Sequence, residues 1–131
     1  MIYLDSNIPM YLIGADHPHK TLTIVTLERL TQENQKLVTS TEVFQEILHR
    51  YTAIQKKGAI QKAYDVLLEL TDHIFDITRL DIEMAKDDLL SHANISARDA
   101  IHIAVMKRNK TNTILSFDRG FDQISKITRI P

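Results

Sequence analysis

The residues of this sequence best suited to joint chemistry are carboxylates that lie far apart along the chain, namely Asp5, Glu46, Asp99 and Asp118. Carboxylate oxygens are the ligands that Mg²⁺ prefers, and the ion binds through one or two of them while keeping several waters. A cation held in this way can activate water for attack on a phosphodiester and neutralise the leaving oxygen. If the acids converge, they repel one another or take up protons unless a cation lies among them. They therefore predict a divalent-metal site for phosphate chemistry.

Each of these acids also has an ordinary structural explanation in its local sequence. Asp5 precedes a helix start that it could cap, and Glu46 with Arg50 has the i,i+4 spacing of a surface pair. Asp99, three residues after a serine, has capping-box spacing, and Asp118 precedes a glycine by two, as in an Asx turn. Separate explanations at four strand or helix ends are less economical than one shared site.

The elements that must position the acids can be predicted from hydrophobic patterning. Short apolar, β-prone runs predict strands over 2–4, 36–39, 73–77, 113–115 and 127–130. Helical stripes of apolar residues predict helices over about 18–34, 41–57, 59–71, 80–92 and 98–109. Thr41 is a candidate cap for the second of these helices, and Gly58 is the expected stop at its end. Pro9 lies in a turn where a helix start would tolerate it.

This alternation of strands and helices predicts an α/β fold with a parallel sheet covered on both faces. Ligands of such sheets lie beyond the carboxyl ends of the strands. Asp5 directly follows a predicted strand, and Asp118 lies just past another, after Ser116 and Phe117. Glu46 lies in the helix after the second strand, and Asp99 starts a helix. The acids therefore fall where a site is expected.

Composition narrows the class of protein. The 131 residues are 44% hydrophobic and 25% charged, which fits one folded domain over 1–131 and excludes general disorder. The net charge of −1 argues against a protein that coats nucleic acid by charge alone. Cysteine is absent, which excludes disulfides and thiolate zinc sites and suits a reducing, cytoplasmic setting. Neither a signal peptide nor a membrane span is predicted.

Four ordered motifs carry a family resemblance. They are IYLDSN at 2–7, TSTEVFQEI at 39–47, SARDAIHIA at 96–104 and ILSFDRGFD at 114–122. In order and spacing they resemble the PIN-domain family, in particular the toxin ribonucleases of VapBC-type toxin–antitoxin modules. The resemblance implies a three-layer α/β/α sandwich with a central parallel sheet. It also implies a metal-dependent endoribonuclease that cleaves single-stranded RNA, and either Mg²⁺ or Mn²⁺ would suit oxygen ligands.

The resemblance also implies roles for individual residues. The matching acids, Asp5, Glu46, Asp99 and Asp118, would gather around the metal and act in catalysis. Asn7 and Ser116 match positions that support the first acid or the metal waters. Glu42 rivals Glu46 on the same helix face, and Asp122 is a rival or auxiliary to Asp118. Independently of the resemblance, Arg98 and Arg119 flank two of the acids and are candidates to hold RNA phosphates, although solvated surface positions explain them equally well.

Partners follow from the resemblance alone. It implies a homodimer and a cognate antitoxin, a segment of which would dock in a groove formed by the helices around 42–71. Candidate groove residues are Tyr51, Ile54, Ile60, Tyr64 and Leu67, for most of which ordinary core packing is the simpler role.

Other functions remain open at this stage. A receiver-like signalling domain would use Asp76 as phosphoacceptor, but Asp5 has no acidic neighbour. A PIN-like RNA-processing nuclease that is not a toxin, or a non-enzymatic interaction domain, would share most of the pattern. His17, His19 and His102 lack the spacing of a zinc site, so surface or packing roles are expected for them.

Overall fold

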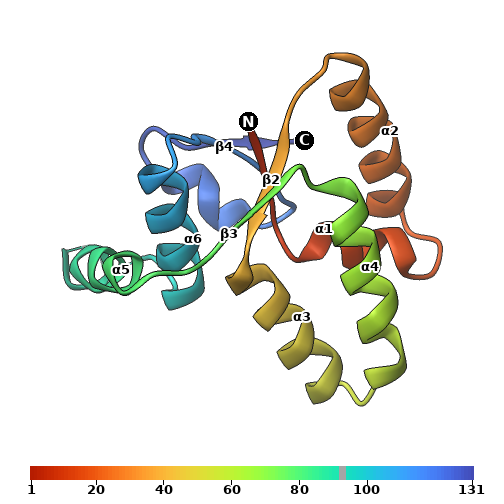
Figure 1. Cartoon of the computed structure of the whole chain (residues 1–131), viewed down its shortest axis with the longest axis horizontal. Coiled ribbons are helices and arrows are strands. Elements are labelled where there is room, and N and C mark those ends of the chain that lie inside the picture. Colours follow the sequence, from red (N-terminus) through yellow and green to blue (C-terminus); the bar gives the residue numbers. More distant parts are fainter. Residues whose placement is uncertain (92–93) are drawn as a thin grey trace.

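The computed structural model describes residues 1–91 and 94–131, and the strands among them form one parallel sheet (Figure 1). Its order is β3-β2-β1-β4-β5, and every neighbouring pair runs parallel. The strands are β1 (Ile2–Leu4), β2 (Leu37–Ser40), β3 (His73–Phe75), β4 (Thr113–Leu115) and β5 (Thr128–Ile130). The short strands are buried near the middle of the sheet, as parallel strands covered on both faces must be.

Helices cover both faces of this sheet. In Figure 1, α1 (Asn7–Ile13), α2 (Pro18–Gln32), α3 (Thr41–Ala53) and α4 (Ile60–Leu70) lie on one side, and α5 (Arg79–Ser91) and α6 (Ala97–Arg108) lie on the other. The strand order explains this division. The chain steps outward from β1 through β2 to β3 and then crosses to β4, and right-handed crossovers in opposite directions place helices on opposite faces. The predicted α/β/α sandwich is confirmed.

Hydrophobic residues of both layers meet on the sheet. Tyr3, Leu4, Ile114 and Leu115 are fully buried in the central strands, between the two helical layers. Between α5 and α6 the buried contact is made by small residues, Ala85, Ala100 and Ala104, which let the two helices approach closely. Within the described ranges, no helix is long and apolar enough to cross a membrane.

Helix ends account for most differences from the sequence prediction. The helix α1 was expected only as a possible start at Pro9, and α3 ends at Ala53 rather than at Gly58. Gln55 takes the left-handed conformation, with φ of 57°, and the Lys56 N–H donates to the Tyr51 carbonyl at 2.8 Å. This is the hydrogen bond of a Schellman motif, formed here without glycine. Two short 3₁₀ helices, η1 (Lys57–Ala59) and η2 (Arg119–Gln123), complete the chain.

Two smaller expectations also fall at helix ends. Thr41 is the first residue of α3 rather than its cap, and its hydroxyl accepts the N–H of Ile77 at 3.0 Å. The helix predicted over 80–92 is present from Arg79 to Ser91, and His92 lies outside the described residues.

Candidate metal centre

The carboxyl ends of β1 and β4 lie side by side at the point where the strand order reverses. β1 pairs with β2 on one edge and with β4 on the other, and the Asp5 N–H donates to the Leu115 carbonyl at 3.1 Å. A crevice opens at such a reversal in parallel sheets. Here it is a cavity of about 440 Å³ lined by Asp5, Ser6, Asn7, Glu46, Ser96, Ala97, Arg98, Asp99, His102 and Asp118. All four predicted acids therefore face one cavity.

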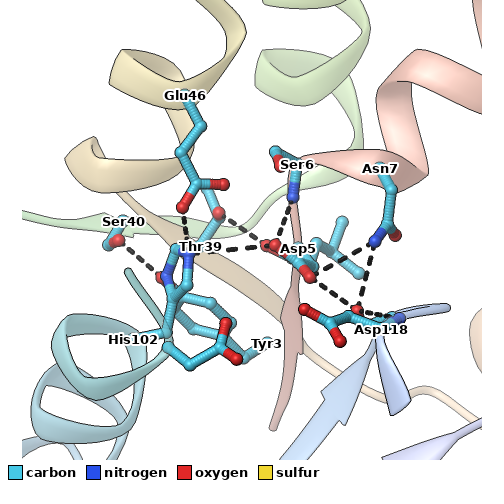
Figure 2. Close-up of polar contacts among 12 residues, drawn as sticks. Tyr3, Asp5, Ser6, Asn7, Thr39, Ser40, Glu46, His102 and Asp118 are labelled. Carbon is cyan, nitrogen blue, oxygen red and sulfur yellow. Dashed lines mark hydrogen bonds and ion pairs between the residues drawn. The ribbon is translucent and has the colours of Figure 1, made fainter. Parts of the chain in front are cut away.

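Asp5 is held from three sides (Figure 2). Its carboxylate accepts hydrogen bonds from the Ser6 N–H at 2.7 Å, the Ser116 hydroxyl at 2.5 Å and the Asn7 amide at 3.3 Å. Only 5% of Asp5 is exposed. Burial raises the pKa of Asp5 despite the nearby His102 and the Ser116 hydrogen bond, and the charge of Glu46 raises it further. Asn7 and Ser116 thus lie where the sequence predicted, against the first acid.

Glu46 is paired with a buried histidine. Its Oε1 lies 2.6 Å from Nε2 of His102, which is also 3.8 Å from Oδ1 of Asp5. Burial would raise the pKa of Glu46, but the hydrogen bond and charge of His102 outweigh it and the pKa is lowered. Burial alone would lower the pKa of His102, yet the hydrogen bond to Glu46 and the charge of Asp5 raise it. In the described chain, ligand atoms of Asp5, Glu46 and His102 lie within 4.8 Å of one another.

His102 is itself fixed by a chain of hydroxyl groups. Its Nδ1 lies 2.7 Å from the Tyr3 hydroxyl, which lies 2.5 Å from Oγ of Ser40. These groups are fully buried and come from α6, β1 and β2. Burial raises the pKa of Tyr3 well above its usual range, so the phenol stays neutral and keeps its proton for this chain. A histidine held at one nitrogen presents the other in a fixed direction.

Of the two roles expected for His102, packing is confirmed, because the residue is buried, and its hydrogen bonds to Glu46 and Tyr3 add a role at the site. The residue lies three positions after Asp99 on α6, and side chains with this spacing share one helix face. That spacing was the available signal, because a face that points Asp99 at a site also points His102 there. What the sequence did not give was the partner at the far nitrogen, since Tyr3 and Ser40 lie on other strands.

Asp99 and Asp118 flank Gly120. The Asp99 N–H donates to the Ser96 hydroxyl at 3.1 Å, and the Gly120 N–H donates to Oδ1 of Asp118 at 2.8 Å. A Cβ atom on Gly120 would lie 3.1 Å from a carboxylate oxygen of each acid, which is tighter than ordinary contact. Burial, followed by the charge of Asp118, raises the pKa of Asp99 to about 6. Asp118 therefore lies close enough to Asp99 to oppose its ionisation.

The two rival acids, Asp122 and Glu42, lie outside the cavity lining. Asp122 forms a bidentate pair with Arg129, at 2.8 and 3.1 Å, and does not line the cavity. Glu42 is buried beside the site, where burial raises its pKa, but it does not line the cavity either. The i,i+4 ion pair considered for Glu46 and Arg50 is not among the ion pairs of the described residues.

The two arginines predicted to hold RNA phosphates differ in their position relative to the cavity. Arg98 lines the cavity, and its charge opposes the rise in the pKa of Glu42 and contributes to the lowered pKa of Glu46. Arg119 is exposed and does not line it, so its phosphate-binding role stays a prediction. Arg50, which the sequence analysis did not select for phosphate binding, lines a cavity that adjoins the first.

The receiver-like alternative does not fit this geometry. Asp76 follows the edge strand β3, and β2 lies between that strand and β1. Asp76 is exposed and lines neither this cavity nor the adjoining one. A phosphoacceptor would have to lie next to the acids that bind its metal.

The chain belongs to the PIN-domain family, whose model matches residues 2–127. It is 49% identical over 130 residues to Ribonuclease VapC13 of Mycobacterium tuberculosis, covering 99% of each protein. Among solved structures, it superposes on VapBC2 of Rickettsia felis, bound to a promoter DNA fragment, with a TM-score of 0.74 and 21% identity over 99% of this chain and 98% of the other. It also superposes on VapC20 of Mycobacterium tuberculosis, described as a Sarcin-Ricin loop cleaving toxin, with a TM-score of 0.73 and 20% identity over 91% of each chain. The family resemblance predicted from the four motifs is confirmed.

Proposed function

We propose that this protein is a metal-dependent endoribonuclease that hydrolyses phosphodiester bonds of single-stranded RNA, and that it is the toxin of a toxin–antitoxin pair. The observation that carries the proposal is the convergence of Asp5, Glu46, Asp99 and Asp118 on one cavity at the strand-order reversal. Family membership and the 49% identity to a ribonuclease support the reaction class.

The donor set fits a divalent cation. Burial and, to a lesser extent, neighbouring carboxylates raise the pKa of Asp5 and Asp99, so a cation among these acids would favour their charged forms. Oxygen donors suit both Mg²⁺ and Mn²⁺. We assign the cation to Asp5, Glu46, Asp99 and Asp118, with His102 beside them.

The chemistry that a bound cation supplies is charge neutralisation at the phosphate and acidification of a coordinated water. The protein's own groups prepare the site. Ser116 and Asn7 orient the Asp5 carboxylate, and the Tyr3–His102 hydrogen bond fixes the direction of Glu46. Arg98 at the rim is positioned to meet the phosphate of an entering strand.

Cleavage assays test the reaction. Wild type should cut a labelled pool of single-stranded RNA when Mg²⁺ or Mn²⁺ is present and should lose this activity in EDTA. Asp5→Asn and Asp99→Asn should both be inactive, while Asp65→Asn, an exposed acid on α4, should retain wild-type rates. Equal cleavage by wild type, Asp5→Asn and Asp99→Asn would sink the proposal.

The toxin role rests on an apolar surface as well as on the relatives. Leu48, Ile54, Tyr64 and Leu68, on or next to α3 and α4, are each 38–47% exposed, which suits docking of an amphipathic antitoxin segment. Of the predicted groove residues, Tyr51 and Leu67 are buried in the core instead. Expression of wild type should halt growth of a host, and Asp99→Asn should not. Growth arrest by both would point to a cause other than RNA cleavage.

A further inference from the structure

A second cavity, of about 480 Å³, continues from the acidic one. Five residues line both cavities, namely Ser6, Asn7, Glu46, Arg98 and Asp118. The second then extends past Met10 and Tyr11 of α1 and Arg50 of α3. A ligand that placed a phosphate among the acids would therefore reach Tyr11 with its neighbouring atoms.

Tyr11 is held by a cluster of aromatic rings. Its ring centroid lies 5.3 Å from that of Phe117, 5.1 Å from that of His17 and 5.0 Å from that of His19. His19 stacks on Phe117 at 4.0 Å with an angle of 15° between the planes. The cluster joins the metal centre through the Phe117 N–H, which donates to Oδ1 of Asn7 at 3.4 Å. Tyr11 is thus a supported ring, partly exposed, at the wall of a cavity.

The second cavity is less acidic than the first. Asp5 and Asp99 line only the first, Glu46, Asp118 and Arg98 line both, and the exposed Arg50 lines the far end of the second. Within residues 1–91 and 94–131, neither arginine forms an ion pair. Arginine binds phosphate oxygens well through its fork of donors, so this end suits an anion adjacent to the one at the metal centre.

We propose that the second cavity binds the nucleotide next to the scissile phosphate, with its base stacked on Tyr11 and its outer phosphate on Arg50 and Arg98. This inference rests on the proposed function, because it takes the acidic cavity as the place of cleavage. The volume lies in the range of ligand pockets. A base can stack on a protein ring only when it is unpaired, so the cavity selects single-stranded RNA by the geometry of its wall.

The test compares two small probes, adenosine 5′-monophosphate and ribose 5-phosphate, by calorimetry or NMR titration in Mg²⁺. Wild type should bind adenosine 5′-monophosphate about 10-fold more tightly than ribose 5-phosphate, because stacking of any base on an aromatic ring raises affinity by about that factor. Tyr11→Leu should remove the difference and Tyr11→Phe should keep it. Arg50→Ala should weaken both probes equally. Arg79→Ala, an exposed arginine on α5, should weaken neither.

RNA cleavage then separates this inference from the proposed function. If the cavity serves RNA, Tyr11→Leu raises the KM for cleavage several-fold and Tyr11→Phe does not. The stacking role is overturned if wild type binds the two probes with equal affinity, or if Tyr11→Leu keeps the wild-type ratio of affinities. Cleavage by wild type would stand in either case. Loss of the probe difference in Tyr11→Leu with an unchanged KM would make the cavity a free-nucleotide site and overturn its assignment to RNA. No cleavage by wild type would overturn the proposed function and with it the assignment of this cavity to RNA, while the probe titrations would still decide whether a base stacks on Tyr11.

Discussion

Asp81 and Asp5 are both buried aspartates, but the pKa of one is lowered and that of the other is raised. Asp81, at the start of α5, accepts two hydrogen bonds from Arg108 at 2.7 and 3.0 Å and one from the Thr78 N–H at 2.8 Å. Burial would raise the pKa of Asp81, yet the bonds from Arg108 and Thr78 lower it. For Asp5, burial raises the pKa despite the nearby His102 and the Ser116 hydrogen bond, and the charge of Glu46 adds to the rise. Asp81 has its cation, Arg108, within the chain, whereas the proposed metal centre would take its cation from solution.

The largest effect should come from neutralising an acid of the metal centre. Asp99→Asn should lower RNA cleavage by at least about 100-fold, the upper range for removing a group that supports a metal site. The same change should stabilise the metal-free protein, because it removes the repulsion between Asp99 and Asp118. Activity assays and thermal melts in EDTA measure the two effects. A lower melting temperature would mean that Asp99 stabilises the fold as Asp81 does.

Asp81→Asn should destabilise the fold, in contrast to Asp99→Asn. It leaves Arg108 beside a neutral partner and should lower the free energy of unfolding by about 3 kcal/mol, the lower end for breaking a buried pair, because 29% of the Arg108 side chain is exposed. Urea denaturation measures the change. The double variant with Arg108→Met should recover part of the loss. A cost below about 1 kcal/mol would place this pair with surface ion pairs instead.

Mg²⁺ should stabilise the protein through the acidic cavity alone. At 100 times its dissociation constant, the ion should add about 2.7 kcal/mol to the free energy of unfolding. Asp99→Asn should reduce this gain, and Asp81→Asn should keep it in full because Arg108 already compensates that carboxylate. Denaturation with and without the metal gives the increments. Equal gains in all three proteins would mean that the ion binds elsewhere.

The contribution of Asp81 to stability should depend on pH. The folded-state pKa of Asp81 is lowered from 3.8, so its stabilising effect is present above pH 4 and is lost as the pH falls through the folded value. The deficit of Asp81→Asn relative to wild type should therefore shrink below pH 4. Denaturation curves from pH 7 to pH 3 would show this convergence. A deficit that stayed constant would mean that Asp81 contributes through packing rather than charge.

The smallest loss of RNA cleavage should come from replacing Asp122, which lies outside both the metal centre and the Asp81–Arg108 pair. Asp122 is paired with Arg129 on β5 and lines neither cavity, so Asp122→Asn should leave cleavage within about 3-fold of wild type. Asp118→Asn, four residues earlier, should be nearly inactive. Assays of the two variants side by side make the comparison. Similar losses in both would mean that the ion pair with Arg129 opens when RNA binds.

Much of this arrangement could be predicted from sequence because it depends on local order. Apolar runs predict the strands, and parallel strands bring Asp5 and the residues after β4 to one edge. Two of the four local explanations also held, whereas Glu46 pairs with His102 rather than Arg50 and Asp5 does not cap α1. Ser96 caps α6 and Asp118 forms an Asx turn, but neither contact draws the acid away from the cavity. A capped or turn-forming acid can therefore still serve a site.

What sequence could not supply were contacts between distant segments. The pairing of Glu46 with His102 joins α3 to α6, and the choice of Asp118 over Asp122 depends on Arg129 of the last strand. The end of α3 was misplaced for a different reason. Glycine is the usual residue after a helix, and here Gln55 takes the left-handed conformation that Gly58 was expected to supply.

The Tyr3 hydroxyl connects the metal centre to the most protected part of the molecule. Tyr3 lies in the central strand, is fully buried, and holds His102 and Ser40 through its oxygen. Parts of a protein that open only with the whole core share its full unfolding free energy, whereas loops open at little cost. The part of this centre around Tyr3 and His102 should therefore open only when the protein unfolds. Rearrangement during substrate entry is left to the rim, where Asp118 and Arg98 are exposed.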